Sequence, residues 1–385
     1  MQNLYIKNIF IVFVLIFTIL FSLILLNLFS FFACTKPLNK TLWLTKENGF
    51  SYFPYDNPNQ QKWFKATFHM HSESLLHYER HSIESLYKVY REFGFDVISV
   101  SDYNHIFYPD FLGHEVESYI PVYEWGLNNK KQHFLSIQAS FVVPDLFPFF
   151  RSLENLQWSI SQIRRGSTFV VLNHPKLLNG FTADMIVDLE GFQAMEVFTP
   201  FGDSLDLWDE VLSKGKPVFS FSSDDLHVFS KEIIDTYLNE SLFKTLWREW
   251  LFFNEDYGSE ALKRYLLIEA PTPKKEDILR SLCKGRYVAV KQNFPETSFA
   301  FPLKEIISNE NVFSITFKEP VQKISFKTKH NQTIIEFHNQ QHGKINLKGL
   351  NYEFIRIEVF DLRGILITNP VFRLNKEIPN FCEVQ

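Results

Sequence analysis

Helix-like and strand-like segments alternate through residues 63–292, and this alternation constrains the fold more than any other feature. Residues 81–94 read as an amphipathic helix with Ser82 as N-cap and Gly94 as terminator, and the buried strand FDVISVSD follows. The same order recurs in residues 159–175 and 205–225. Alternating β and α units predict an α/β fold with a parallel sheet or barrel.

The helical pattern stops after Gln292. Six short segments typical of strands follow, namely SITFKE, VQKISFKT, TIIEFHN, GKINLKG, FIRIEVFD and GILITNPVFR. We expect them to form a small C-terminal β-sandwich. The predicted organisation is a membrane segment (1–35), a polar linker (36–62), an α/β domain (63–292) and the β-sandwich (293–385).

The N-terminal segment carries no charge from Asn8 to Thr35, which is long enough to cross a bilayer of roughly 30 Å as a helix. The apolar core of a signal peptide is shorter, about 7–15 residues, so ordinary cleavage is not expected. Cys34 follows the small Ala33, where a bacterial lipoprotein would be cut and acylated, and is a lipidation candidate. A lipoprotein and an uncleaved anchor both stay open. Either attaches the protein to a membrane, and the likeness to an export signal favours an extracytoplasmic domain.

Composition excludes some classes of partner and site. The formal net charge is -5, and lysines and arginines are scattered, so no basic stripe for nucleic acid is expected. Three cysteines are too few and too far apart for a disulfide framework or a thiolate zinc site.

Imidazole and carboxylate side chains stand where predicted strands end. His69 and His71 are two residues apart in FHMHS, so on an extended chain both rings point the same way and can hold one ion. Taken singly, each of the others has an ordinary structural interpretation, as a loop carboxylate or a capping residue. Together they predict a site for zinc, manganese or iron. The set is His69, His71, Glu124, His133, His174, Asp225 and His227.

The order of these motifs resembles the PHP (polymerase and histidinol phosphatase) family over residues 63–292. H-x-H is followed by S-D-x-N, an E…H pair, N-H-P and D-x-H. The segments YEWGLNNKKQHFLSI and GRYVAV are most similar to the branch that contains the carbaryl-type hydrolases. The resemblance implies a distorted seven-stranded β/α barrel with two or three divalent metal ions.

The resemblance also implies roles for the residues. A first ion would be held by His69, His71, Glu124 and Asp225; Glu124 would bridge to a second ion bound by His133 and His174; and a third would take His227 and His77. Glu124 and Asp225 would thus stand at the catalytic centre.

The chain departs from the family pattern at one motif. Where the family has T-D-H-N, this sequence has Ser101, Asp102, Tyr103 and Asn104, so a histidine ligand is a tyrosine. We therefore expect a third ion to bind weakly or not at all, with His105 and His81 as open substitutes. Asp102 is expected to orient a ligand, and Glu196, at another strand end, to be structural.

Hydrolysis of a small phosphoester by a metal-activated water is the leading hypothesis, with other esters and carbamates open. The alternative is an exported binding or surface protein with a partly degenerate metal site. The third hypothesis is a structural lipoprotein in which the set of histidines is accidental.

Overall fold

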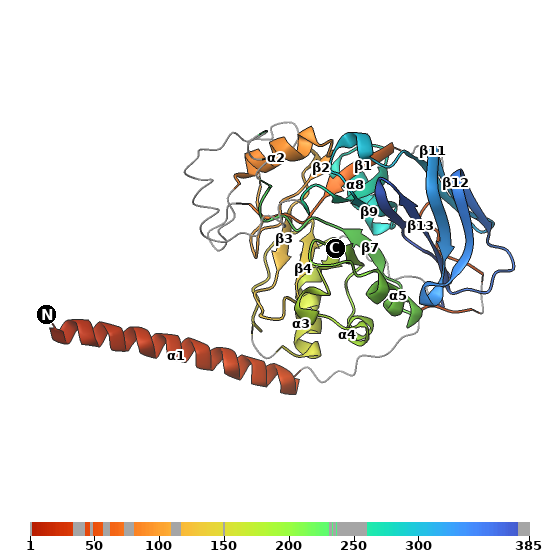
Figure 1. Ribbon diagram of the computed structural model, residues 1–385. Coiled ribbons are helices and arrows are strands. Elements are labelled where there is room, and N and C mark those ends of the chain that lie inside the picture. Colours follow the sequence, from red (N-terminus) through yellow and green to blue (C-terminus); the bar gives the residue numbers. More distant parts are fainter. Residues whose placement is uncertain are drawn as a thin grey trace.

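The computed structural model describes residues 2–33, 43–46, 49–56, 62–72, 81–108, 117–148, 151–230, 233, 236 and 260–375. Helix α1 (Gln2–Ala33) extends away from a body of sheets and shorter helices (Figure 1). Within α1, Asn8–Leu25 is long and apolar enough to cross a membrane, and none of it is buried. Because this stretch has no charged residue, it offers no strongly polar face to water.

The larger of the two sheets joins strands from distant parts of the chain. β1 pairs in parallel with β2 and antiparallel with β8, and the order is β10-β11-β13-β14-β9-β8-β1-β2, with β12 on β11 and β15 on β13. The strands are β1 (Lys62–Thr67), β2 (Val97–Ile98), β8 (Arg264–Ala270), β9 (Tyr287–Gln292), β10 (Leu303–Ser308), β11 (Val312–Lys327), β12 (Thr333–Asn346), β13 (Phe354–Asp361), β14 (Gly364–Thr368) and β15 (Val371–Phe372).

The smaller sheet has the order β3-β4-β5-β6-β7. Its strands are β3 (Val122–Trp125), β4 (Phe134–Ile137), β5 (Phe169–Leu172), β6 (Ala194–Phe198) and β7 (Phe219–Ser222). The expected parallel pairing holds from β5 to β7 and is wrong from β3 to β5, which are antiparallel. The short link between β3 and β4 makes β4 run against β3, because a parallel neighbour needs a crossover of a dozen or more residues. β4 also runs against β5, whose direction β6 and β7 share.

The helix predicted after the H-x-H motif is confirmed as α2 (Ile83–Glu92). The Ser82 hydroxyl accepts a hydrogen bond from the Ser85 amide at 3.2 Å, and Gly94 follows with a φ of +75° that suits glycine. The other helices are α3 (Leu153–Arg165), α4 (Ala183–Asp188), α5 (Leu205–Ser213) and α8 (Lys275–Cys283), with 3₁₀ turns at Leu177–Asn179, Thr297–Phe299 and Lys329–Asn331.

Single contacts connect the two sheets. Met70, beyond β1, forms a parallel bridge with Leu226, beyond β7, and Tyr103, beyond β2, forms one with Glu124 in β3. These bridges bring the ends of β1, β2, β3 and β7 together around one space. Because only single bridges join the sheets there, the seven-stranded barrel stays a prediction.

The C-terminal strands differ from the expected separate sandwich. β14 pairs with β9 from Gly364↔Gln292 to Thr368↔Val288, so these strands continue the sheet of the first region. Four of the six predicted short strands are two long ones, β11 and β12. Pro320 reads as a break because it lacks an amide proton, but it lies in a register shift between Thr316 and Val321 that the ladder tolerates.

The described parts of the predicted linker belong to the core. Leu44 bridges to Leu374 and Tyr52 to Phe372, and the buried Tyr55 hydroxyl donates to the Tyr287 carbonyl at 2.7 Å. On the other side of the sheet, buried Arg356 in β13 bonds Asp209 of α5 at 2.6 Å. These contacts fix the C-terminal strands against the α/β region.

Candidate metal centre

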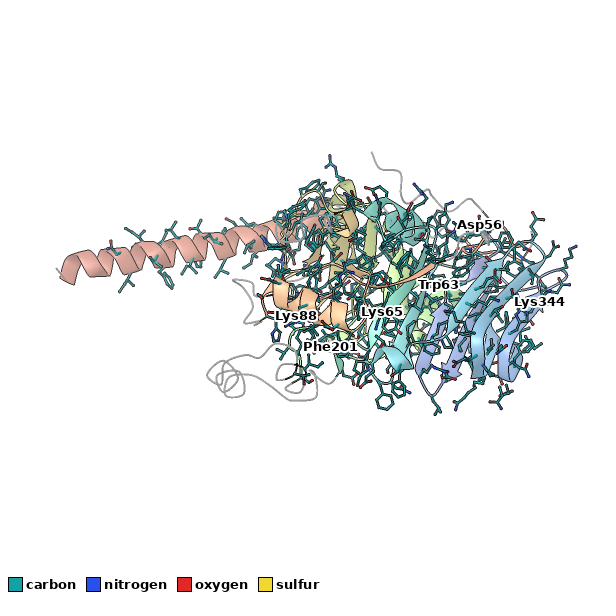
Figure 2. The ribbon with its side chains drawn as sticks, turned by 90° about the horizontal axis from the view of Figure 1, so that it is seen from above. Asp56, Trp63, Lys65, Lys88, Phe201 and Lys344 are labelled. Atoms are coloured by element: carbon teal, nitrogen blue, oxygen red, sulfur yellow. The ribbon has the colours of Figure 1, made fainter. Side chains whose placement is uncertain are left out.

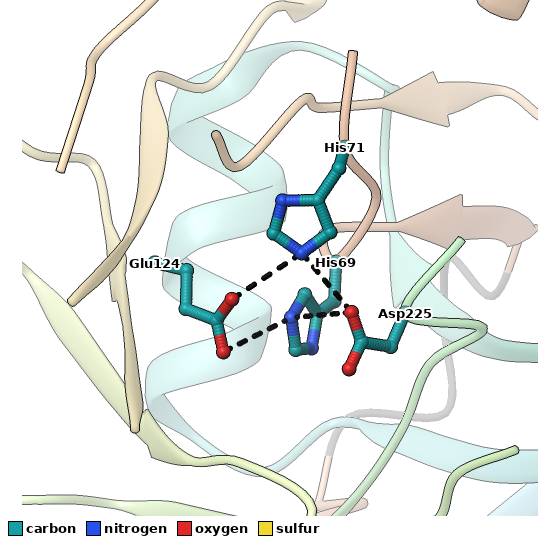
Figure 3. A group of neighbouring side chains, drawn as sticks. All are labelled: His69, His71, Glu124 and Asp225. Carbon is teal, nitrogen blue, oxygen red and sulfur yellow. Dashed lines mark hydrogen bonds and ion pairs between the residues drawn. The ribbon is translucent and has the colours of Figure 1, made fainter. Parts of the chain in front are cut away.

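Four side chains from three segments meet in the space between the sheets. His69 and His71 follow β1, Glu124 lies in β3 and Asp225 follows β7 (Figure 3). The structure therefore brings together the first predicted ligand group. All four are at most 3% exposed, so bulk water reaches little of their surface.

The ligand atoms of this first group lie close together. His69 Nε2 is 3.4 Å from Glu124 Oε1 and 3.2 Å from Asp225 Oδ1. His71 Nε2 is 3.3 Å from Glu124 Oε2 and 3.0 Å from Asp225 Oδ1. An ion with tetrahedral bonds of about 2.0–2.1 Å would hold its ligand atoms about 3.3 Å apart, which matches these spacings.

A second group shares Glu124 with the first. Glu124 Oε1 lies 2.9 Å from His133 Nδ1 and 3.1 Å from His174 Nε2. His133 directly precedes β4 and His174 follows β5, and both are buried. The two groups, each with ligand atoms within 4.8 Å of one another, thus meet at one carboxylate.

Hydrogen bonding alone leaves this cluster incomplete. His69 Nε2 and Glu124 Oε2 are buried without a hydrogen-bond partner, although oppositely charged groups lie within 3.4 Å of them. Buried polar atoms nearly always find a partner, so close approach without a bond needs a reason. A cation between these atoms would satisfy them, and the donor set therefore fits a divalent metal ion.

The backbone is strained at two of these residues. His174 has a φ of +25° and Asp225 a φ of +41°. Positive φ is rare for residues other than glycine, and such strain costs of order 1–3 kcal/mol, which makes it common mainly at functional sites. Here the strained conformations turn both side chains toward Glu124.

Electrostatics also favour a cation in the cluster. Burial would raise the pKa of Glu124, but the charges of His133 and His69 hold it well below its usual range. Burial likewise opposes the proton on His71, yet the nearby carboxylates of Asp225 and Glu124 raise its pKa to about 10. The buried carboxylates are thus stabilised by nearby positive charge, which protons or metal ions can supply.

Glu196 in β6 orients His69 and is the residue that the sequence prediction undervalued. Its Oε1 accepts from His69 Nδ1 at 2.8 Å and from the Ser223 hydroxyl, and its Oε2 accepts from the His174 amide at 2.7 Å. With the proton on Nδ1, His69 presents Nε2 to the ligand group. Such a carboxylate fixes the ring and tautomer of a ligand histidine. The signal in the sequence was that Glu196, like the N-H-P motif, stands at the end of a predicted strand.

Two further residues hold the ligands in place. Asp102, expected to act indirectly, accepts from the Ser72 amide at 2.7 Å and from its hydroxyl at 2.6 Å, which anchors the chain directly after His71. Asn173, which the sequence reasoning did not single out, donates to Glu124 Oε1 at 2.9 Å.

Tyr103 covers one side of the cluster. Its ring stacks on His71 with centroids 4.5 Å apart and planes 12° apart. The tyrosine thus packs against a predicted ligand at the position where the family pattern has a histidine.

The remaining predicted residues are placed as follows. His227 lies at the edge, its side chain 32% exposed, with Nδ1 2.8 Å from the Asp225 carbonyl and its ring 4.6 Å from that of His71. His81 accepts from the Phe229 amide at 3.3 Å, and His105 is exposed; neither belongs to the two ligand groups found among the described residues. His77 and Cys34 lie outside the described residues.

No protein-family model matches the sequence, and no curated protein matches it. A solved structure of a two-domain protein containing a predicted PHP-like metal-dependent phosphoesterase, from Bacteroides vulgatus ATCC 8482, is similar to this chain with a TM-score of 0.41. The identity is 14%, over 84% of this chain and 99% of that one. With so distant a likeness, the family and its branch stay predictions from the motifs.

Proposed function

We propose that the protein is a metal-dependent hydrolase that cleaves phosphoesters at a two-ion site. The observation that carries this proposal is Glu124, whose two oxygens lie among two groups of buried histidines and a second carboxylate. Imidazole with carboxylate suits zinc, manganese or iron. Two ions bound there would lower the pKa of a shared water to near neutrality and clamp the oxygens of a phosphoryl group.

The residues of the chain prepare the site for this reaction. His69, His71, Glu124 and Asp225 would hold one ion, and Glu124, His133 and His174 the other. Glu196 keeps the proton on His69 Nδ1, and Asp102 keeps the chain beside His71 in place. Because the contacts are buried and pre-formed, little reorganisation is needed when a charged substrate arrives.

His227 and Phe201 mark the side from which a substrate would approach. His227 is the one member of the described set with appreciable exposure, at 32% of its side chain against 0–1% for the others. Phe201 stands edge-on to both His174 and His227, with centroids 6.0 and 6.5 Å apart. A phosphoester would therefore enter past an imidazole and an aromatic edge. Carboxyl esters and carbamates are further candidates for this site.

The alternative is an exported binding protein with a partly degenerate site. Tyr103 favours it, since its ring packs on His71 and it offers no imidazole. The two functions differ in turnover, so one assay separates them.

We also propose that the protein is attached to a membrane with its α/β region outside the cytoplasm. The apolar stretch of α1 supports attachment. Cys283, the last residue of α8, is disulfide-bonded, and disulfides persist mainly in oxidising compartments. The other cysteines, Cys34 and Cys382, lie outside the described residues.

The function is tested with the full-length protein in detergent, using an aryl phosphate monoester, an aryl phosphodiester, an aryl acetate and an aryl carbamate. We expect phosphate release that stops after chelation and returns with zinc, manganese or iron. Asp225→Asn should reduce turnover strongly, whereas His338→Ala, at an exposed histidine 63% accessible, should not. Metal binding without turnover of any substrate would favour the binding protein, and neither binding nor turnover would reject the metal site.

A further inference from the structure

A cavity lies at the end of the larger sheet remote from the candidate metal centre. Its volume is about 220 Å³, and β8, α8 and the turn before β9 line it. Trp63 of β1 pairs with Glu269 of β8, and His69 comes six residues later, so the two places are about 20 Å apart along the strand. Figure 2 shows Asp56, near this cavity, well away from Phe201, beside the metal centre.

Glu269 is the unexplained group in this cavity. It is 4% exposed, and its Oε2 is buried without a hydrogen-bond partner. A buried carboxyl oxygen without a partner is costly, so it calls for an explanation such as a proton or a bound group. Burial raises its pKa to about 7, with Arg286 opposing the rise and Asp56 and Glu305 adding to it.

The charged groups around Glu269 do not neutralise its carboxylate. Arg286, the nearby cation, is engaged by Asp56 and donates to the Pro54 carbonyl at 3.1 Å. Asp56 and Glu305 add negative charge. An ammonium group would supply both the charge and the donors that the Glu269 carboxyl lacks.

The outer part of the cavity has the opposite character. Arg280 and Lys284 line it and are exposed, and Arg280 is held by Asp277 at 3.0 Å. A ligand with an acidic group at its outer end would meet these cations. A single water needs only about 10–15 Å³ of such space, so the cavity has room for a small organic molecule.

We propose that this cavity binds a small zwitterion of the amino-acid type, its ammonium group on Glu269 and its acidic group toward Lys284 and Arg280. The site is independent of the metal centre and of the hydrolase activity. Because the ammonium group needs an ionised partner, binding should weaken as pH falls below about 7.

The test is calorimetric titration of the full-length protein at pH 8 and pH 6. The probes are glycine, 4-aminobutyrate and leucine, with butylamine and butyrate as analogues that keep one charged group each. We expect at least one zwitterion to bind, and both analogues to bind about tenfold more weakly or worse, since each loses a charged contact. The same zwitterion should bind more weakly at pH 6.

Three variants make the proposal specific. Glu269→Gln should lose about tenfold or more in affinity, and Lys284→Ala should weaken the zwitterion but not butylamine. Glu276→Gln, on the same helix with a side chain 67% exposed, should bind like the wild type. Absence of binding to every probe at about 10 mM, or equal affinity in a Glu269→Gln protein that still unfolds cooperatively, would overturn the proposal.

Discussion

At the scale of single residues, the proposed metal centre depends on side chains outside its two ligand groups. Glu196 touches His69, the His174 amide and Ser223, and so connects both ligand groups. Removing the charge of Glu196 leaves the ligand residues in place but no longer fixes the proton of His69 on Nδ1. Such a group acts through another, so its effect should show in metal affinity before it shows in folding.

We expect Glu196→Gln to lower metal affinity about 10–100-fold, the range typical of such supporting carboxylates. Competition with a chelator would measure it, with the melting temperature of the metal-free protein as the check on folding. Glu210→Gln, at a carboxylate 56% exposed on α5, is the matched control and should bind metal normally. Unchanged affinity in Glu196→Gln would show that His69 is oriented by other contacts.

The sequence indicated the ligand residues more readily than their supports. Imidazoles and carboxylates at strand ends indicate a metal site because these side chains are common metal ligands. Six of them meet in the structure: His69, His71, Glu124, His133, His174 and Asp225. Glu196 and Asn173 act through hydrogen bonds between strands that are distant in sequence. No local pattern encodes those contacts, so spacing could not distinguish Glu196 from a structural carboxylate.

At the scale of elements, a buried ion network joins β13 to α5. Arg356, 1% exposed, contacts Asp209 at 2.6 Å, Glu358 at 3.0 Å and Asn331 at 3.1 Å. Truncating one member leaves the other charges buried without compensation. The network therefore ties the C-terminal strands to the α/β region.

Arg356→Leu should destabilise the protein by about 3–5 kcal/mol, because Asp209 loses its buried cation and Glu358 keeps only Lys327 at 2.9 Å. Urea unfolding followed by tryptophan fluorescence would measure the loss. Lys323→Ala, which breaks a half-exposed pair with Glu336 at 3.7 Å, should cost at most about 1 kcal/mol. Equal effects in the two variants would mean that the buried network does not hold the regions together.

The strand β8 carries a pH-dependent contribution through Glu269. Its pKa of about 7 exceeds the ordinary value of 4.5, so the folded protein holds this proton more tightly than the unfolded chain. The stability that this provides is complete below about pH 4.5 and is lost as pH rises through 7. Glu269→Gln should therefore melt at a higher temperature than the wild type at pH 8, with the difference shrinking toward pH 5. A constant difference at every pH would contradict the shifted pKa.

The pairing of the C-terminal strands could not be predicted from the sequence. The strand character of most of residues 314–373 was predictable from their short apolar segments, and α2 from its cap and terminator, whereas β10 was not predicted. Whether β14 pairs with β9 or with a strand of a separate sheet depends on contacts between distant segments, such as Asn369 with Gly285. Local periodicity does not contain that choice.

At the scale of the whole molecule, the proposed attachment to a membrane rests on the apolar stretch of α1. The full-length chain should enter the detergent phase in phase partitioning, and residues 36–385 should stay in the aqueous phase, since the apolar stretch lies in α1. Cys34→Ser then decides the mode of attachment: unchanged partitioning and no loss of acyl mass would rule out lipidation. Full-length protein found in the aqueous phase would reject the anchor itself.

The central claim is that Glu124 serves two ions at once. Elemental analysis of the purified protein after dialysis measures it directly, and we expect about two ions per chain in the wild type. Glu124→Gln removes the shared charge and should empty both positions, whereas His174→Ala should empty mainly one, because an imidazole nitrogen binds one ion. Full metal content in Glu124→Gln would contradict the shared site and leave each ligand group to be explained separately.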